Sequence, residues 1–500
     1  MNLLILFIIG LAAAFKDAPT ILSAKQGVIC SPIHQSKEKA FIELKDDNNK
    51  IPTLIFKYID LVNFTNIPII EEFHQLYPNE KPTLYKNMIK DGKFNVDAAE
   101  GYKVDDGKFY NGDSTVKFTV PDSGIYCIYI APDKDKEFSI PVVFKNSYGN
   151  LPYSYYMIYS QLKWFILISI ALFAYLLNYI LKFKVGDDFK NLDSISVISK
   201  GIIFLILAPA ILVSIVQWIN FFLKNWFVES CSQSFFMDLL SFLTELVNHC
   251  FNAYTSFIVL LFSMGYGVIY YHNGNSHHYR MFPQKSLNRV ASLLFLNILV
   301  MFLYSIAISL QNNKPYVVGI YNSPQQTTNQ PGPLALILAG LNSLFAIIWF
   351  VLTIVFYFKT KKTIAKFPPA PNEENTEKVG KAFKRSILAL FVLPFVVFLV
   401  GGIILGVLMT NQLKDIPEYP SNTERELLYQ SVLEFMLLEK FMNKLILPSI
   451  WSAWLYFILL VGSIFFIWIK DNNGLIIDRN ANDPIEYAEV DNNFEISDEE

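Results

Sequence analysis

Two patterns of hydrophobic and polar residues divide the chain near residue 150. Before that point polar and apolar residues alternate over short stretches, as in "AFIELKDDNNKIPTLIFKYID" (40–60), where apolar runs flank an Asp/Asn-rich turn. Alternation with a period of two predicts strands that are buried on one face. Beyond residue 161 long uncharged runs are separated by charged segments. Runs of about 20 apolar residues are long enough to cross a membrane as helices.

The first part of the chain contains further strand candidates. "STVKFTVPDSGIYCIYIAP" (114–132) predicts two strands interrupted by Pro121 and Gly124, and "EFSIPVVF" (137–144) predicts another. Short strands separated by turn residues are typical of sandwiches. Residues 15–150 are therefore predicted to form a small β-sandwich.

The second part of the chain, 155–470, is predicted to be an all-α bundle of seven transmembrane helices. The predicted spans are 162–181, 200–223, 237–271, 288–310, 334–358, 386–409 and 445–469. Composition agrees, because 53% hydrophobic residues and 15% aromatic residues exceed what an ordinary soluble enzyme carries. The net charge of −3 provides no basic stripe for nucleic acid, so nucleic acid is not expected as a partner.

The N-terminal residues 1–14, "MNLLILFIIGLAAA", are predicted to be a secretory signal peptide without a basic start. The alternative is a short anchor, but about a dozen apolar residues are too few to span. Cleavage places the sandwich in the lumen, and seven crossings then place the C-terminus in the cytosol. Lysines and arginines concentrate in the connections that this orientation makes cytosolic, in agreement with the positive-inside rule.

The four cysteines fall into two pairs. Cys30 and Cys127 are the only cysteines of the predicted sandwich, so a disulfide is the simplest assignment in an oxidising lumen, with two free thiols as the alternative. Cys231 and Cys250 can bridge only if residue 250 lies near the lumenal surface. Asn63-Phe64-Thr65 is the only lumenal sequon and marks Asn63 as a candidate glycosylation site.

The boundary between the two parts is rich in aromatic residues. Amphipathic rings favour the headgroup level of a bilayer, so an interfacial belt is predicted where the sandwich meets the first helix. Its members are Tyr153, Tyr155, Tyr156, Tyr159 and Trp164.

The third predicted span carries polar residues on one helical face: Asp238, Ser241, Glu245, Asn248, His249, Asn252 and Thr255. Ionisable groups at membrane depth tend to face a bundle interior or a water-filled cavity. One interpretation is a lumen-open polar cavity in which Glu245 and His249 titrate as a pair and sense lumenal acidity. The alternative is hydrogen bonding between helices, or a helix whose first turns project into the lumen.

Three local patterns resemble those of one family. "SGIYCIYI" (123–130) resembles the Gly-x-Tyr-Cys strand of Golgi-dynamics (GOLD) domains, and "NSYGNLPYSYY" (146–156) resembles the junction before the first helix of lung seven-transmembrane-receptor-like proteins. "SMGYGV" (263–268) resembles the Ser-Leu-Gly-Tyr-Gly-Val motif of the same group. The whole chain therefore resembles the GOST family, Golgi-associated proteins with a lumenal GOLD-like sandwich and seven helices, and is similar to its fungal branch.

The family motif covers Ser263, Gly265, Tyr266 and Gly267, which we expect inside the third helix. There the two glycines permit close helix approach or a local bend, with a gating hinge as the alternative. The chain departs from the family pattern after this motif and at "WIKDNNG" (468–474), where the family has Trp-Arg-Pro.

The C-terminal segment 471–500 is acidic and aperiodic, so a disordered cytosolic tail is predicted. Tyr487 and Val490 fit a Tyr-x-x-hydrophobic sorting signal for clathrin-adaptor or retromer-type machinery, and Ser497 is a candidate phosphosite. The alternative is a tail that only solvates the protein.

Neither catalytic chemistry nor a cofactor is predicted. The chain lacks Gly-x-Ser-x-Gly, His-Glu-x-x-His and phosphate-binding glycine motifs, so it is not expected to be an enzyme. His272, His277 and His278 lack the companion ligands of a typical metal site, so no metal is expected.

The resemblance implies a Golgi membrane protein that cycles to endosomes and takes part in vesicle-mediated trafficking, either Golgi–endosome sorting or retrograde transport. Its lumenal domain would bind cargo or a partner, and membrane lipids would surround its helices. The alternatives are a receptor-like sensor resembling a G-protein-coupled receptor, and a cation-conducting or lipid-binding protein that uses the polar cavity.

Overall fold

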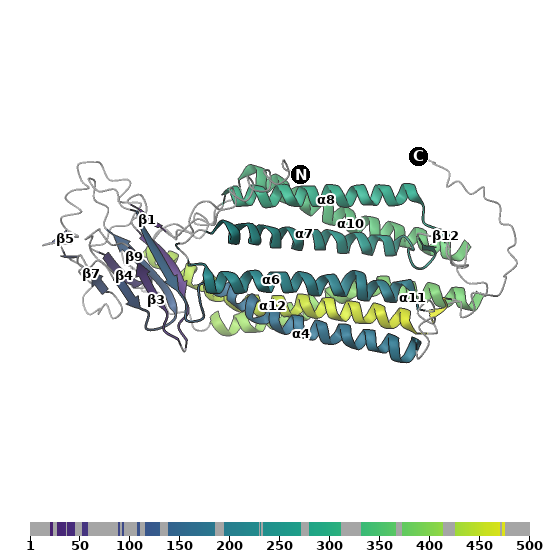
Figure 1. The fold of residues 1–500 in the computed structure, drawn as a ribbon, viewed down its shortest axis with the longest axis horizontal. Helices are drawn as coiled ribbons and strands as arrows, with labels where there is room; N and C mark the ends of the chain where they lie inside the picture. The colour runs from purple at the N-terminus through teal and green to yellow at the C-terminus, as the bar shows by residue number, and fades with distance from the viewer. Residues whose placement is uncertain are drawn as a thin grey trace.

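The computed structural model has a region of β-sheets at one end of a bundle of long helices (Figure 1). It describes residues 21–23, 28–36, 38–45, 53–58, 89–90, 93–94, 108–110, 116–130, 139–185, 195–229, 231, 234–271, 280–311, 332–366, 373–413, 426–470 and 473–475. We call the end of the bundle beside the sheets the sheet end, and the opposite end the far end.

The sheet region contains two four-stranded antiparallel sheets. The first has the order β1 (Ile21–Ser23), β10 (Ser139–Lys145), β3 (Phe41–Leu44), β8 (Val116–Thr119). The second has the order β2 (Val28–Ile33), β9 (Gly124–Ile130), β4 (Thr53–Lys57), β7 (Lys108–Tyr110). β5 (Ile89–Lys90) pairs with β6 (Lys93–Phe94) in an antiparallel arrangement.

The two sheets share one apolar core, to which Ile42 and Val142 contribute from the first sheet and Ile55 and Ile128 from the second. The strands predicted within 40–60, 114–132 and 137–144 are all present. The two strands of 40–60 do not pair with each other, however, because β3 pairs with β8 and β10 while β4 pairs with β7 and β9.

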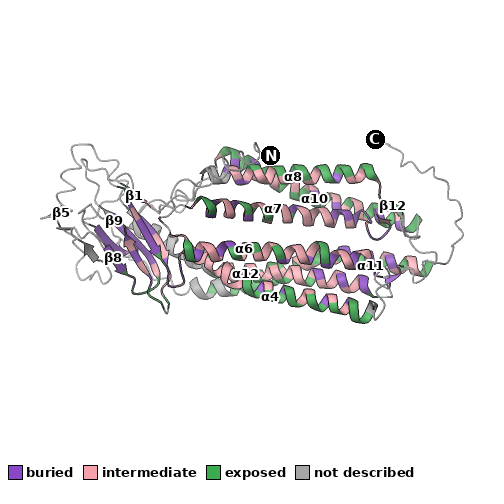
Figure 2. Cartoon of the chain, viewed as in Figure 1, coloured by how far each residue is buried: buried purple, intermediate pink, exposed green. Residues whose placement is uncertain are grey.

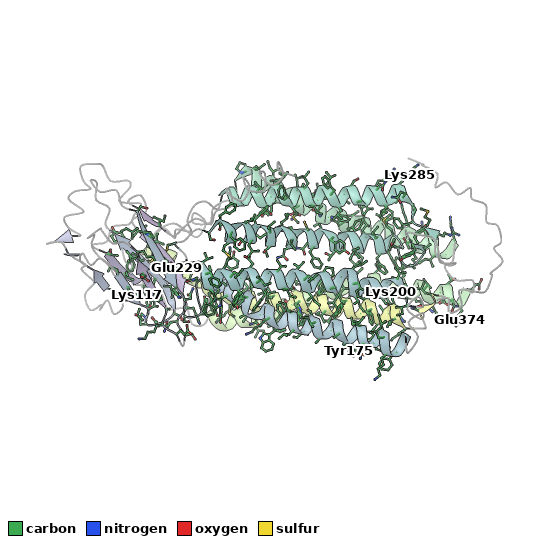
Figure 3. The ribbon with its side chains drawn as sticks, in the orientation of Figure 1. Lys117, Tyr175, Lys200, Glu229, Lys285 and Glu374 are labelled. Atoms are coloured by element: carbon green, nitrogen blue, oxygen red, sulfur yellow. A yellow bond between two sulfur atoms is a disulfide. The ribbon has the colours of Figure 1, made fainter. Side chains whose placement is uncertain are left out.

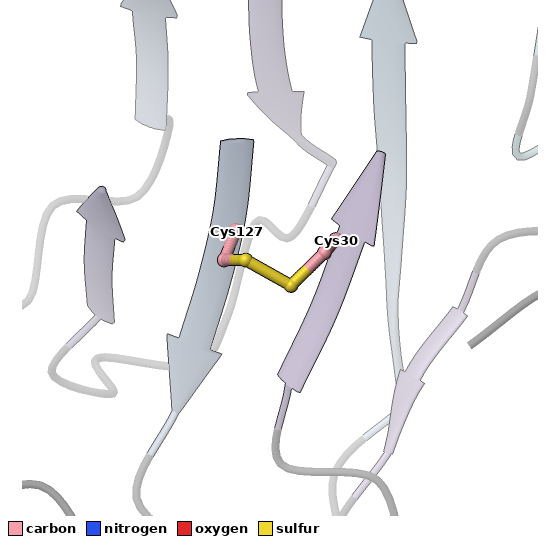
Figure 4. Close-up of a disulfide and its surroundings, with 2 residues drawn as sticks. All are labelled: Cys30 and Cys127. Carbon is pink, nitrogen blue, oxygen red and sulfur yellow. A yellow bond between two sulfur atoms is a disulfide. The ribbon is translucent and has the colours of Figure 1, made fainter. Parts of the chain in front are cut away.

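The predicted disulfide fits the structure (Figure 4). Cys30 on β2 and Cys127 on β9 are direct partners in the strand register and are joined by a disulfide across 97 positions of sequence. Cys231 and Cys250 are not bridged. Cys231 precedes the helix Phe235–Ser263, and Cys250 lies about 22 Å along that helix, out of reach of Cys231.

Seven helices are long and apolar enough to cross a membrane, so the chain is built as a multi-pass membrane protein. They are α4 (Tyr153–Tyr179) with the π-helical η2 (Ile180–Val185); α5 (Val197–Gly201), η4 (Ile202–Leu207) and α6 (Ala208–Phe227) as one span; α7 (Phe235–Ser263); α8 (Gln284–Gln311); α10 (Pro333–Lys366); α11 (Glu373–Leu413); and α12 (Glu426–Ile469). The short β11 (Tyr270–Tyr271) and β12 (Arg280–Met281) pair between α7 and α8.

Several helices extend beyond the predicted spans: α4 begins at Tyr153, because the polar and aromatic residues before the apolar run of 162–181 are already helical. One predicted boundary is wrong. The third span ends at Ser263 and not at 271, because the backbone turns out of the helix at Gly265.

The helices pack in a defined order. α4 lies beside α6 and α12, and α11 runs along α12. α7 contacts α6, α8 and α10. The largest apolar cluster is at the far end, where Phe383, Phe465 and Trp468 are fully buried, while the outer faces of the bundle are exposed and apolar (Figure 2).

Candidate functional site

The linker between the sheets and α4 is held by the buried side chain of Asn146. Its Oδ1 accepts a hydrogen bond from the His34 backbone N–H (2.7 Å), and its Nδ2 donates to the Leu151 carbonyl (2.9 Å). Its backbone exchanges hydrogen bonds with Gly149, which closes the turn. Asn146 therefore ties the end of β2 to both sides of the linker.

A second asparagine, Asn225 near the end of α6, binds the same linker from the helix side. Its Oδ1 accepts from the Leu151 N–H (3.1 Å) and its Nδ2 donates to the Tyr148 carbonyl (2.8 Å). Its backbone carbonyl accepts from the Asn150 N–H (3.1 Å). Asn225 is only 2% exposed, so these bonds form away from water, where an unsatisfied partner is costly.

Gly149 is required at the centre of this linker. Its φ of +133° is unfavourable for other residues, and a Cβ there would collide with the Asn225 side chain. We call Asn146, Gly149, Leu151 and Asn225 the asparagine clamp. It fixes how the sheets sit on α4 and α6.

Aromatic rings surround the clamp. Tyr148 stacks on Tyr156 with ring centroids 3.7 Å apart, and His34 lies 4.9 Å from Tyr153. Tyr155 and Trp164, two members of the predicted interfacial belt, are about half exposed on the helix surface. Tyr156 instead faces the junction, so the tyrosines serve two different surfaces.

Charged groups outside the clamp add a second connection. Lys45, just after β3, forms an ion pair with Glu229, just after α6, and Figure 3 shows Glu229 beside the sheets. The hydrogen bond to Glu229 raises the pKa of Lys45.

Burial lowers the pKa of His34 and raises the pKa of the Cys231 thiol. At neutral pH the ring of His34 is therefore uncharged against the tyrosines.

The structure places the polar residues predicted in the third span in one stripe along α7. Asp238 is buried in the first turn, Glu245 and Asn252 are exposed, and Asn248 and His249 are half-buried. Ser241 donates a hydrogen bond to Asn220 of α6 (3.2 Å). This last bond fits the alternative of polar contacts between helices.

The exposed part of this stripe does not share the apolar outer face of α7. Phe236, Leu243 and Val247 are exposed and recur at helical spacing, whereas Glu245 is two residues from Leu243 and so points about 200° away around the helix. One flank of α7 contacts α6 through Ser241, and the other contacts α8, where Phe242 lies 5.9 Å from Phe302. Glu245 and Asn252 lie between these two flanks, opposite the apolar face.

Of the family motif, Ser263 is the last residue of α7, whereas Gly265, Tyr266 and Gly267 lie in the turn that follows and not inside the helix, which corrects the sequence prediction. The Tyr266 N–H donates to the Leu261 carbonyl (3.0 Å) and the Gly265 N–H donates to the Phe262 carbonyl (2.9 Å). This is the Schellman pattern that ends helices, and it needs a left-handed residue where Gly265 has φ +92°.

The turn also connects three helices. Thr360 of α10 donates to the Ser263 carbonyl (2.8 Å), and a Cβ on Gly267 would lie 2.9 Å from Ile198 of α5. Gly267 therefore permits close packing, as predicted. The packing is between the turn and α5, however, and not between two helices.

Sequence reasoning missed a hydrogen-bonded lock at the far end. The Trp468 Nε1 donates to the Ser386 Oγ (2.9 Å), and the Trp468 carbonyl accepts from the Ser196 Oγ (3.1 Å) and the Asn473 Nδ2 (2.7 Å). Gly474, at φ +85°, lies against Asn375 and Val379 of α11. The sequence signal for this turn was Asn-Asn-Gly directly after a long helix, because glycine in a left-handed conformation often follows the end of a helix.

Several predicted sites lie outside the described residues: Asn63, Tyr487, Val490 and Ser497. His272, His277 and His278, for which no metal is expected, also lie outside them. Among the described residues no group of His, Cys, Asp or Glu is arranged to hold a metal ion. No protein-family model matches the chain, and no curated protein matches its sequence.

Proposed function

We propose that this protein is a GOST-type multi-pass protein of Golgi and endosomal membranes that takes part in vesicle-mediated trafficking. In this proposal the sheet region is a lumenal GOLD-like domain that binds cargo or a partner. The observation that carries the proposal is the asparagine clamp, which presents a disulfide-bonded two-sheet domain at a fixed place on seven membrane-length helices. The motifs that resemble the family supply the compartment and the trafficking role.

The distribution of charge supports the proposed orientation. Basic residues on the described helices and turns gather at the far end, where Lys200 and Lys285 lie (Figure 3). Others there are Lys182, Arg280, Arg289, Lys359, Lys361, Lys362, Lys366, Lys378, Lys381, Lys384, Arg385 and Lys470. Basic residues favour the cytosolic side, so the far end is cytosolic and the sheet end lumenal in this proposal.

A clamped domain suits cargo selection better than a domain on a flexible tether. The domain and the helices move together, so a ligand bound on the sheets is held at a set height above the bilayer. Any change that ligand binding makes in the linker reaches α4 and α6 directly through Leu151 and Asn225.

The test is rescue of sorting in cells that lack the protein. Wild type should restore the distribution of retrograde and endosomal reporters, Asn225→Ala should restore it poorly, and Asn220→Ala, with one hydrogen bond from Ser241, should resemble wild type. Residence outside Golgi and endosomal membranes, or normal sorting without the protein, would refute the proposal.

The accessible inner stripe of α7 favours a second candidate function. Glu245 and Asn252 lie opposite the apolar face, where a carboxylate and an amide suit a cation or a polar lipid group. Glu245→Gln should reduce cation flux in reconstituted vesicles, whereas Ser343→Ala on α10 should not. Absence of flux with the wild-type protein excludes conduction.

A further inference from the structure

On the outer face of α10, exposed apolar residues and basic residues follow one another along a single stripe. Val351 and Val355 are 48% and 41% exposed, and Lys359, Lys362 and Lys366 follow at intervals of three or four residues. Residues at this spacing lie above one another on a helix. The stripe that contacts hydrocarbon in a membrane therefore continues directly into three exposed ammonium groups.

The neighbouring helix α11 repeats this arrangement. Phe395, Val392 and Leu388 are exposed along one stripe, which leads to Lys384 and Arg385, both also exposed.

The two helices are adjacent at this level. Phe350 lies 5.3 Å from Phe391, and Tyr357 lies 5.6 Å from Phe383. Since the helices run in opposite directions, Lys359 and the Lys384–Arg385 pair lie at similar depth.

Within the described residues, the charges of this surface are not paired with carboxylates. Lys378 and Lys381 of α11 pair with Glu374 and Glu377. No ion pair involves Lys359, Lys362, Lys366, Lys384 or Arg385 within the described segments, and the Lys359 ammonium lies 5.4 Å from the Phe356 ring. We call these five residues the headgroup surface.

We propose that the headgroup surface binds a phospholipid whose headgroup carries phosphate monoesters on an inositol ring. The exposed apolar stripes would hold the acyl chains, which places the headgroup beside the ammonium groups. Lys359, Lys362 and Lys366 follow one another within about 10 Å along one stripe of α10, which suits a headgroup with several negative charges better than one with a single charge. Arg385 can bind a phosphate with two parallel hydrogen bonds. This inference does not depend on the proposed trafficking role or on which leaflet the far end faces.

The test uses the full chain in nanodiscs of neutral phosphatidylcholine. One sample also contains a phosphorylated inositol lipid, and the other contains phosphatidylserine in an amount that gives the same total lipid charge. Bound lipid is counted by native mass spectrometry. The variant Lys359→Gln with Lys362→Gln and Lys366→Gln should lose roughly a hundredfold in affinity, because each basic residue near an anionic surface contributes about fivefold.

The matched control removes the same number of charges elsewhere at the far end, through Lys285→Gln, Lys378→Gln and Lys381→Gln. It should retain affinity within about threefold of wild type, since two of these lysines are already paired. Equal losses in both variants, or equal binding of phosphatidylserine, would overturn the proposal. If the triple variant does not fold, Lys362→Glu alone should still lower the affinity at least tenfold.

Discussion

The two ends of the helix bundle are held by different kinds of interaction. At the sheet end, the amides of Asn146 and Asn225 bind backbone groups of the linker, and each bond has one partner and one direction. At the far end, Phe383, Phe465 and Trp468 join a broad apolar cluster that a few hydrogen bonds complete. Apolar packing tolerates substitution of similar volume, whereas a directional bond to a backbone group does not. Orientation of the sheets therefore depends on few residues, and closure of the far end on many.

The largest difference in stability between the sheets and the helices should come from removing the disulfide. Replacing Cys30 and Cys127 with serine frees a loop of 97 residues and should destabilise the sheets by about 4–5 kcal/mol, with little effect on the helices. Proteolysis of the sheets in increasing urea, compared with the helical circular dichroism of the same sample, measures both. Serine at Cys231 and Cys250, which are not bridged, is the control. Simultaneous loss of both signals would show that the regions unfold as one.

The next largest effect should come from Asn225→Ala, which removes two side-chain hydrogen bonds and leaves the Tyr148 carbonyl and the Leu151 N–H unsatisfied. The junction should lose about 2–3 kcal/mol. Spin labels on β8 and on α12 should then give a broader distance distribution, although the sheets and bundle each remain folded. Asn225→Asp keeps the acceptor for Leu151 but sets a carboxylate oxygen against the Tyr148 carbonyl, so it should broaden the distribution as well. An unchanged distribution in Asn225→Ala would mean that the clamp does not set the orientation.

At the far end a comparable substitution should matter less. Trp468→Phe loses the hydrogen bond to Ser386 but keeps most of the buried ring, so the expected cost is about 1 kcal/mol. Thermal unfolding in detergent measures it, and Tyr175→Phe at a 56% exposed position should have no effect. A cost for Trp468→Phe as large as that for Asn225→Ala would remove the contrast between the ends.

The smallest expected effect is a pH dependence of the junction. Burial lowers the pKa of His34, so the unfolded chain binds a proton more readily than the folded one. Stability of the junction should therefore fall as the pH drops below about 6.5, the ordinary value for histidine, and level off below the folded pKa. His34 is partly solvated, so the change should be smaller than that from Trp468→Phe. The spin-label distances between pH 7.5 and 5.5 report it, and His34→Gln should abolish it.

Hydrophobic patterning predicted the seven helices because the membrane requires runs of a set length and apolarity. It misplaced the end of α7 because a helix ends where hydrogen bonding ends, and apolar residues such as Val268 and Ile269 continue past Gly265. It predicted the strands around Cys127 but not that β3 and β4 belong to different sheets, since pairing depends on residues distant in sequence.

The clamp was the part of the site that patterning could not supply. Asn146 and His34 are 112 positions apart, and Asn225 and Leu151 are 74 apart. Asn146 lies in the junction motif 146–156, but the motif does not tell which groups its side chain binds, and nothing near Asn225 marks that residue as a ligand for a distant backbone group. The stripe on α7 was predictable because helical spacing alone brings Glu245 and Asn252 to one face.

The turn at Gly474 has a consequence for whatever follows it in the chain. Asn473 binds the carbonyl of Trp468 and Gly474 rests on the first turns of α11, so the backbone leaves at Leu475 from an anchored origin. A protein that binds residues beyond Leu475 would therefore be held near the N-terminal end of α11. A probe fused at that point would report its orientation relative to the helices as well as its position.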